Sequence, residues 1–267
     1  SLQGFNDEQV DYFYHFLQTE NPDWLRGVVT GPGSPDLSET RFRLPKKYMH
    51  RHYADITHTV RCQYPVLHWD QAFALTLGRE PVNPQPHYYA EIHDRYASFT
   101  DGFLTYSDGA HDDLNKIIWS RKGWNSSENA AEITEQYVSF FFGTNADDRV
   151  EDAISGLETN WNGPIETNGS IAMTFLRWQQ LENLYPELQQ NWRWQMLLLR
   201  AYYDTYIQSR KRYERLLERK ANEILAQAPI LGSGESMNLA LEKVCEADRV
   251  NIAPQLRQRI KDYCEML

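Results

Sequence analysis

Residues 101–113 read Asp-Gly-Phe-Leu-Thr-Tyr-Ser-Asp-Gly-Ala-His-Asp-Asp. The segment from Asp101 to Tyr106 is short and largely apolar, and Ser107-Asp108-Gly109 ends it, which is typical of a strand. Polar residues follow at 107–109, and residues 111–121 have the composition and spacing of a helix. A strand that ends in polar residues and leads into a helix predicts one unit of an α/β fold.

Two more segments of the same kind precede it. We predict strands at residues 24–30 and 49–56, and helices at 6–20, 38–44, 69–77 and 88–96. Strands that alternate with helices indicate parallel pairing. In parallel sheets, ligands bind at the carboxyl ends of the strands. The polar residues after each predicted strand are therefore the first place to look for a functional site.

Strand-like segments are not found after residue 128. We predict helices at 131–142, 146–161, 168–184, 236–247 and 254–267, and one long continuous helix at 187–228. The fold class is therefore α/β followed by all-α, with residues 1–128 and 129–267 as the two domains. Three strands cannot close a barrel, which needs eight. The first domain is thus the last part of a (β/α) barrel or a small open sheet, and the second is an antiparallel helical bundle.

Composition excludes several classes of function. The chain has 267 residues and a formal charge of −10, so it lacks the surplus of Lys and Arg that binding to nucleic acid or to anionic membranes requires. No apolar run approaches the roughly 20 residues that span a bilayer. The three cysteines, Cys62, Cys245 and Cys264, form neither a disulfide framework nor a zinc motif. We therefore expect no metal, no cofactor, no nucleic acid and no membrane.

The strongest chemical candidate follows the third predicted strand. Residues 108–113 hold three carboxylates and an imidazole, and acid–base hydrolysis needs two carboxylates in different environments. Asp108 is the candidate catalytic residue, although a cap of the next helix explains it equally well. Asp113 fits a helix start better than catalysis. Tyr106, Asp112 and Asn115 are candidate substrate contacts.

A second group of candidates follows the strand at 49–56. Strand alternation places His50 and His52 on one face, where we expect a pair of satisfied histidines on a surface strand, and Arg51, Tyr53 and Asp55 on the other. The remaining candidates could form hydrogen bonds with a sugar, pack an aromatic ring against it or, through a guanidinium group, bind the carboxylate of a uronic acid. They are Asp55, His58, Tyr64, Trp69, Asp70 and Arg79. A metal site at Asp55 and His58 is disfavoured because no His-x-x-x-His spacing accompanies them.

These segments together resemble a known group of proteins. The residues that carry the resemblance are Asp55-Ile56-Thr57-His58, Gln63-Tyr64-Pro65, Trp69-Asp70, Gly78-Arg79-Glu80, Asn83-Pro84, Tyr106-Ser107-Asp108-Gly109, Asp112-Asp113-x-Asn115-Lys116, Trp119-Ser120, Asn191-Trp192-Arg193 and Arg200-Ala201-Tyr202-Tyr203. The group consists of bacterial barrel proteins related to glycoside hydrolases. Their layout is similar to that of α-glucuronidases and hyaluronidase-like β-N-acetylglucosaminidases, with a helical C-terminal domain.

The resemblance implies carbohydrate chemistry, and it implies that the first strands of the barrel lie upstream of residue 1. The resemblance also implies Glu where this chain has Asp108, so the shorter acid is a departure from the pattern of the group. Our prediction is a C-terminal part of a glycoside hydrolase, with carbohydrate as partner; the full-length protein is then secreted or periplasmic. Two alternatives stay open: a carbohydrate-binding module without activity, and a helical domain for protein interaction or structure.

Overall fold

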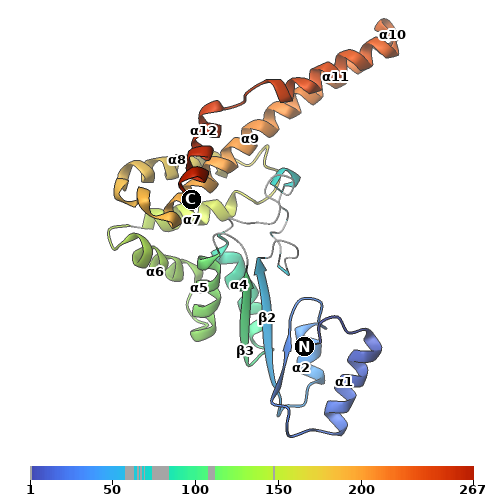
Figure 1. Ribbon diagram of the computed structural model, residues 1–267, viewed down its shortest axis with the longest axis vertical. Coiled ribbons are helices and arrows are strands. Elements are labelled where there is room, and N and C mark those ends of the chain that lie inside the picture. Colours follow the sequence, from blue (N-terminus) through green and yellow to red (C-terminus); the bar gives the residue numbers. More distant parts are fainter. Residues whose placement is uncertain are drawn as a thin grey trace. The chain divides into compact units, whose positions relative to one another are not determined.

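The computed structural model describes residues 2–57, 63–64, 66, 68, 70–73, 84–107, 112–146 and 148–267. Within them the chain is mostly helical and has one three-stranded parallel sheet (Figure 1). The predicted class, α/β followed by helices, is confirmed. The chain divides into two compact units, residues 1–66 with 77–158 and residues 67–76 with 159–267. The predicted domain boundary at residue 128 stays a prediction, because compact units and folding domains are different properties.

The first unit contains the sheet and the helices on its flank. Its strands are β1 (Gly27–Thr30), β2 (Met49–Thr57) and β3 (Gly102–Ser107), and its helices are α1 (Asp7–Thr19), α2 (Leu37–Arg43), α4 (Pro86–Ala97), α5 (Asp113–Trp124), α6 (Ala130–Phe142) and α7 (Asp148–Thr159), whose last residue belongs to the second unit. The strand order is β1-β2-β3, with all neighbours parallel. Each of the three predicted strands is thus present.

Local sequence explains where several helices begin. The side chain of Asn6 accepts from the backbone N–H of Gln9 at 2.9 Å, and the Gln9 side chain accepts from the Asn6 N–H at 3.0 Å, which is a complete capping box. Asn129 and Glu132 form the same box at the start of α6. These reciprocal bonds satisfy donors that a helix start otherwise leaves open.

Within the described residues, the helices that contact the sheet, α1, α4 and α5, cover the same face of it. The side chains of Val28 and Thr30 on β1 and of His50, His52, Ala54 and Ile56 on β2 point to this face and are buried. Helix α1 packs there through Tyr14 and Leu17, in one cluster with Val28. Helices α4 and α5 cover the part near β3, where a Cβ at Gly123 would lie 2.2 Å from the Phe103 ring. A glycine is therefore required for α5 to approach β3 this closely.

The second unit is built around one long helix. It contains α8 (Ser170–Leu184), η1 (Pro186–Gln190), α9 (Trp192–Leu225), α10 (Ala228–Leu231), α11 (Ser233–Arg249) and α12 (Pro254–Met266). Helices α8, α11 and α12 pack against α9. The buried ion pair of Arg200 and Asp204, 2.9 Å apart, lies in its core, where the guanidinium stacks on the Trp161 ring.

The prediction of one continuous helix over residues 187–228 is wrong at both ends. Asn191 is extended, and its side chain accepts from the backbone N–H groups of Arg193 and Trp194, so α9 begins only after it. At the other end the helix stops at Leu225, and a new short helix with Pro229 in its first turn follows at Ala228. Apolar periodicity continues through both breaks, and for that reason periodicity alone did not find them.

Candidate functional site

The carboxyl ends of β2 and β3 bring two of the predicted residues together. Asp55 and Tyr106 are paired in register on neighbouring strands, and both belong to the face that the described helices leave uncovered. Asp55 is 4% exposed and Tyr106 is 40% exposed. The backbone N–H of Asp55 donates to the side-chain oxygen of Gln63 at 3.2 Å, which ties the end of β2 to the segment that follows it.

Tyr53 joins them on the same face. Its ring centroid lies 6.3 Å from that of Tyr106, with the rings tilted by 60°. A Cβ at Gly31 would lie 2.7 Å from the Tyr53 ring, so this ring lies close against the backbone after β1. Burial, and then the nearby Asp55 carboxylate, raise the pKa of Tyr53. The carboxyl edge therefore presents one carboxyl group beside two phenol rings.

The start of α5 holds the predicted Asp112 and Asn115, and both are buried. Asp112 occupies the position before the helix, although its side chain makes no capping hydrogen bond there. The side-chain oxygen of Asn115 accepts from the backbone N–H of Gln85 at 2.9 Å, so Asn115 fixes the chain before α4. Asp113 accepts from the Tyr137 hydroxyl at 3.2 Å, which agrees with a structural role at the helix start.

Tyr64 does not lie beside Asp55 and Tyr106. Its hydroxyl is 3.3 Å from Nε2 of His52, and its ring lies 6.3 Å from the Trp119 ring, both on the covered face of the sheet. Burial raises the pKa of this phenol. Tyr64 is therefore part of the packing beneath the helices in this structure.

Asp70 belongs to the second compact unit. Its carboxylate accepts from the backbone N–H groups of Ala72 at 2.8 Å and Ile165 at 3.0 Å, which joins two separate segments of that unit. These bonds give Asp70 a structural role. The other predicted residues, Asp108, His58, Trp69 and Arg79, lie outside the described residues, and their assignments stay predictions.

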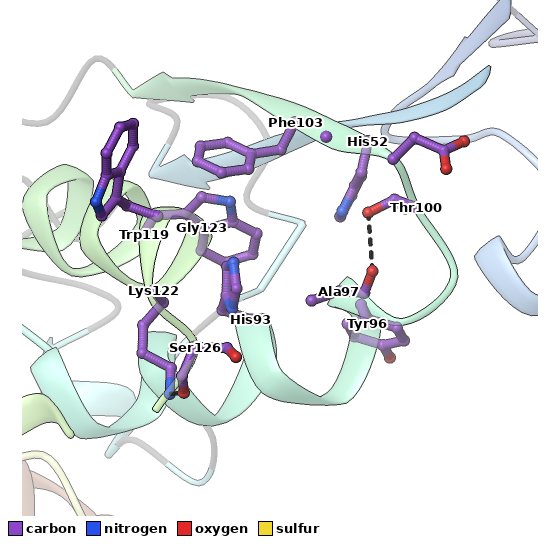
Figure 2. A pocket seen from close by; sticks show the side chains of 13 residues that line it. His52, His93, Tyr96, Ala97, Thr100, Phe103, Trp119, Lys122, Gly123 and Ser126 are labelled. Atoms are coloured by element: carbon purple, nitrogen blue, oxygen red, sulfur yellow. Dashed lines mark hydrogen bonds between the residues drawn. The ribbon is translucent and has the colours of Figure 1, made fainter. Parts of the chain in front are cut away.

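A pocket of about 340 Å³ lies at the opposite, amino-terminal edge of the sheet, between the strands and the ends of α4 and α5 (Figure 2). Rings and imidazoles form much of its wall, namely His52, His93, Tyr96, Phe103 and Trp119. His93 stands edge-on to both Phe103 and Trp119, with interplanar angles of 90° and 83°. The sequence did not indicate this pocket, because its wall combines residues from four separate elements.

The electrostatics of this pocket do not suit acid–base hydrolysis. Burial lowers the pKa of His52 to about 4 and also lowers that of His93, so both imidazoles are neutral at pH 7. The Lys122 ammonium donates to the carbonyl of Ser126 at 2.6 Å and pairs with Asp94 at 2.9 Å. Asp101, the carboxylate in the wall, is bound by Arg41 at 3.1 Å. The carboxyl edge is therefore the better candidate for hydrolytic chemistry.

Comparison with known proteins gives no guide to the site. No protein-family model, curated protein or solved structure matches the chain. Across the part of the chain that the structure describes, no cluster of three or more His, Cys, Asp or Glu side chains could hold a metal ion. In the same residues no helix is both long enough and apolar enough to cross a membrane.

Proposed function

We propose that β1, β2 and β3 are consecutive strands in the wall of a (β/α) barrel. Two observations support this proposal. The strands follow one another in sequence order, and those helices of the described residues that contact them cover one face only. A doubly wound sheet has helices on both faces. In a barrel, the second face of each strand is covered by the other strands and forms the interior.

The uncovered face has the composition that this proposal requires. Met49 is 44% exposed, Leu104 is 49% exposed and Tyr106 is 40% exposed, although parallel sheets are covered on both faces. Further strands would bury Met49 and Leu104 in the barrel interior. The carboxyl end of the same face, at Asp55 and Tyr106, would then line the bottom of the active-site pocket.

On this fold we propose that the protein is a glycoside hydrolase that acts by carboxylate acid–base chemistry. The observation that carries the proposal is the pairing of Asp55 with Tyr106 on adjacent strand ends, beside the ring of Tyr53. Ring faces pack on the apolar faces of sugars, and a carboxylate accepts hydrogen bonds from their hydroxyl groups. Such a site binds and orients a pyranose.

In this proposal Asp108, the residue directly after β3, is the acid or base. One carboxyl group protonates the glycosidic oxygen, and a second carboxylate either attacks the anomeric carbon or activates a water molecule. Asp55 holds sugar hydroxyl groups, and Asp112 and Asn115 support the site from the start of α5. Tyr64 has no part in it if its packing against His52 persists in the complete barrel.

A panel of 4-nitrophenyl glycosides, including the β-glucuronide, the α-glucuronide and the N-acetyl-β-glucosaminide, tests this function. We expect Asp108→Asn to lower kcat/KM by about 100-fold or more, as the loss of an acid–base group does, and Asp55→Asn to lower it because a contact to the sugar hydroxyl groups is weakened. Asp101→Asn is the matched control, because Asp101 lies at the other end of the same sheet. If Asp108→Asn and Asp55→Asn both leave turnover intact, the catalytic assignment is wrong. Binding without turnover would indicate a carbohydrate-binding module.

A further inference from the structure

Residues 210–249 form an arm of two helices, the far half of α9 and α11, which the short α10 connects (Figure 1). Few side chains of this arm are buried. Of the thirteen buried residues of α9, eleven lie at or before Gln208, and only Leu217 and Ala221 lie in the arm. Helix α11 buries Ser236 and Ala240. Four buried residues, three of them small, form little core for two helices of this length.

The same arm exposes a large share of apolar side chains. On α11, Met237, Leu241 and Val244 follow one another at spacings of four and three residues, which places them on one side of the helix, and they are 62%, 65% and 47% exposed. Leu225, Ile230 and Leu231, near the tip, are also exposed, at 42%, 85% and 41%. A contiguous apolar stripe of this kind marks a surface that binds another protein.

The charges of the two helices are opposite. Residues 210–220 of α9 contain six basic and two acidic side chains, a net charge of +4. Helix α11 contains four acidic and two basic side chains, a net charge of −2. A second copy of the arm therefore offers a complementary partner for each helix, whereas pairing of α11 with α11 would bring like charges together.

We propose that the arm is a dimerisation surface, in which two copies of this chain associate side by side with α11 of one copy against α9 of its partner. A two-fold axis along the arms gives this arrangement, with neighbouring helices antiparallel. The four helices then enclose the stripe of Met237, Leu241 and Val244, as the apolar positions of a four-helix bundle are enclosed. Opposite net charges fix which helices are neighbours.

Light scattering during gel filtration of the protein, from about 1 to about 100 μM, tests the proposal over the range of affinity expected of a modest interface. We expect a dimer whose dissociation constant rises at least tenfold in Leu241→Glu. Met173→Glu is the control, since Met173 lies outside the arm on α8 and is 59% exposed. Circular dichroism checks that both variants keep the helical content of the parent protein.

A second variant tests the charge argument. Glu242→Lys reverses one charge of α11 without removing apolar surface, and we expect it to weaken the dimer and to remove much of its dependence on salt. A protein that stays monomeric up to about 100 μM overturns the proposal, as does a dimer that Leu241→Glu leaves unchanged. A monomer would leave the stripe as a surface for a different protein.

Discussion

The two faces of the sheet in the first unit differ sharply in burial. On the covered face, His50, Ala54 and Ile56 are fully buried, and His50 bonds both to Thr30, at 2.7 Å, and to the Phe99 carbonyl, at 3.0 Å. On the other face, Leu104 and Tyr106 are among the exposed large apolar residues. The same strands thus supply a buried face that stabilises the unit and an exposed face that carries the candidate site, since side chains that alternate along a strand face different surroundings.

The largest effect is expected on the covered face. Trp119 is 2% exposed and contacts the rings of His52, His93 and Phe103. We expect Trp119→Ala to lower the free energy of unfolding by about 3–5 kcal/mol, because the substitution removes a large buried side chain and leaves a cavity. Chemical denaturation measures this change.

Trp124 is the matched control for that substitution. It lies on the same helix and is 88% exposed, so Trp124→Ala should change stability by less than about 0.5 kcal/mol. Equal effects of the two substitutions would show that the covered face is not the stabilising one.

The next largest effect is a loss of folding stability at acidic pH. The folded-state pKa of His52 is about 4, below its ordinary value of 6.5, so the unfolded chain binds more protons between these two values. Stability is therefore fully present above pH 6.5 and falls as the pH decreases toward 4, by up to about 3 kcal/mol from this group. Burial lowers the pKa of His50 and His93 in the same direction. Denaturation midpoints from pH 7.5 to 4.5 measure the loss.

His52→Gln isolates the contribution of that one imidazole. The variant starts from a lower stability, but its slope against pH below 6.5 should be smaller than that of the parent protein. An unchanged slope would mean that His52 is not the group that titrates.

A smaller loss is expected from the hydrogen bond between β1 and β2. Thr30→Val keeps the shape of the side chain but removes the hydroxyl, which is 2.7 Å from Nε2 of His50. We expect a loss of about 1–3 kcal/mol, because a buried imidazole nitrogen is left without its partner. Thr167→Val is the control, since the Thr167 hydroxyl is exposed and bonds locally to Pro164. A similar loss in both variants would point to a general effect of valine.

The smallest effect belongs to the uncovered face. Leu104 is 49% exposed, so Leu104→Thr should change the stability of this chain by less than about 0.5 kcal/mol. The same substitution should cost more in a polypeptide that contains the other strands of the proposed barrel, because Leu104 would then be buried. Equal losses in the two proteins would argue against the barrel.

The three strands and the sorting of residues between their faces could be predicted from the sequence, because alternation with a period of two is a local property. The arrangement of His50 and His52 opposite Arg51, Tyr53 and Asp55 is confirmed, but the surface strand expected for the two histidines is wrong, because helices cover that face and bury both side chains. The break at Asn191, where α9 begins, was missed, because the apolar periodicity continues through the residue that caps the helix.

The candidate site could be predicted only in part. Asp55 and Tyr106 were each predicted as candidates near the end of a strand, and the structure adds that they are paired in register on neighbouring strands. The positions of Tyr64 and Asp70 did not follow, because each depends on a contact with a distant segment: a buried imidazole for Tyr64 and the Ile165 backbone for Asp70. Such contacts are properties of the tertiary structure and leave no spacing in the sequence.

The central claim, that the carboxyl end of the uncovered face binds a sugar, is tested most directly by calorimetric titration with N-acetylglucosamine and with glucuronic acid. Tyr106→Ala is compared with Trp124→Ala, which removes an exposed aromatic ring from the helix on the other face. The proposal predicts that one of these sugars binds, that Tyr106→Ala weakens its binding about tenfold, or by about 1.4 kcal/mol, and that Trp124→Ala leaves it unchanged. No binding of either sugar, or equal affinity in the parent protein and Tyr106→Ala, would contradict it.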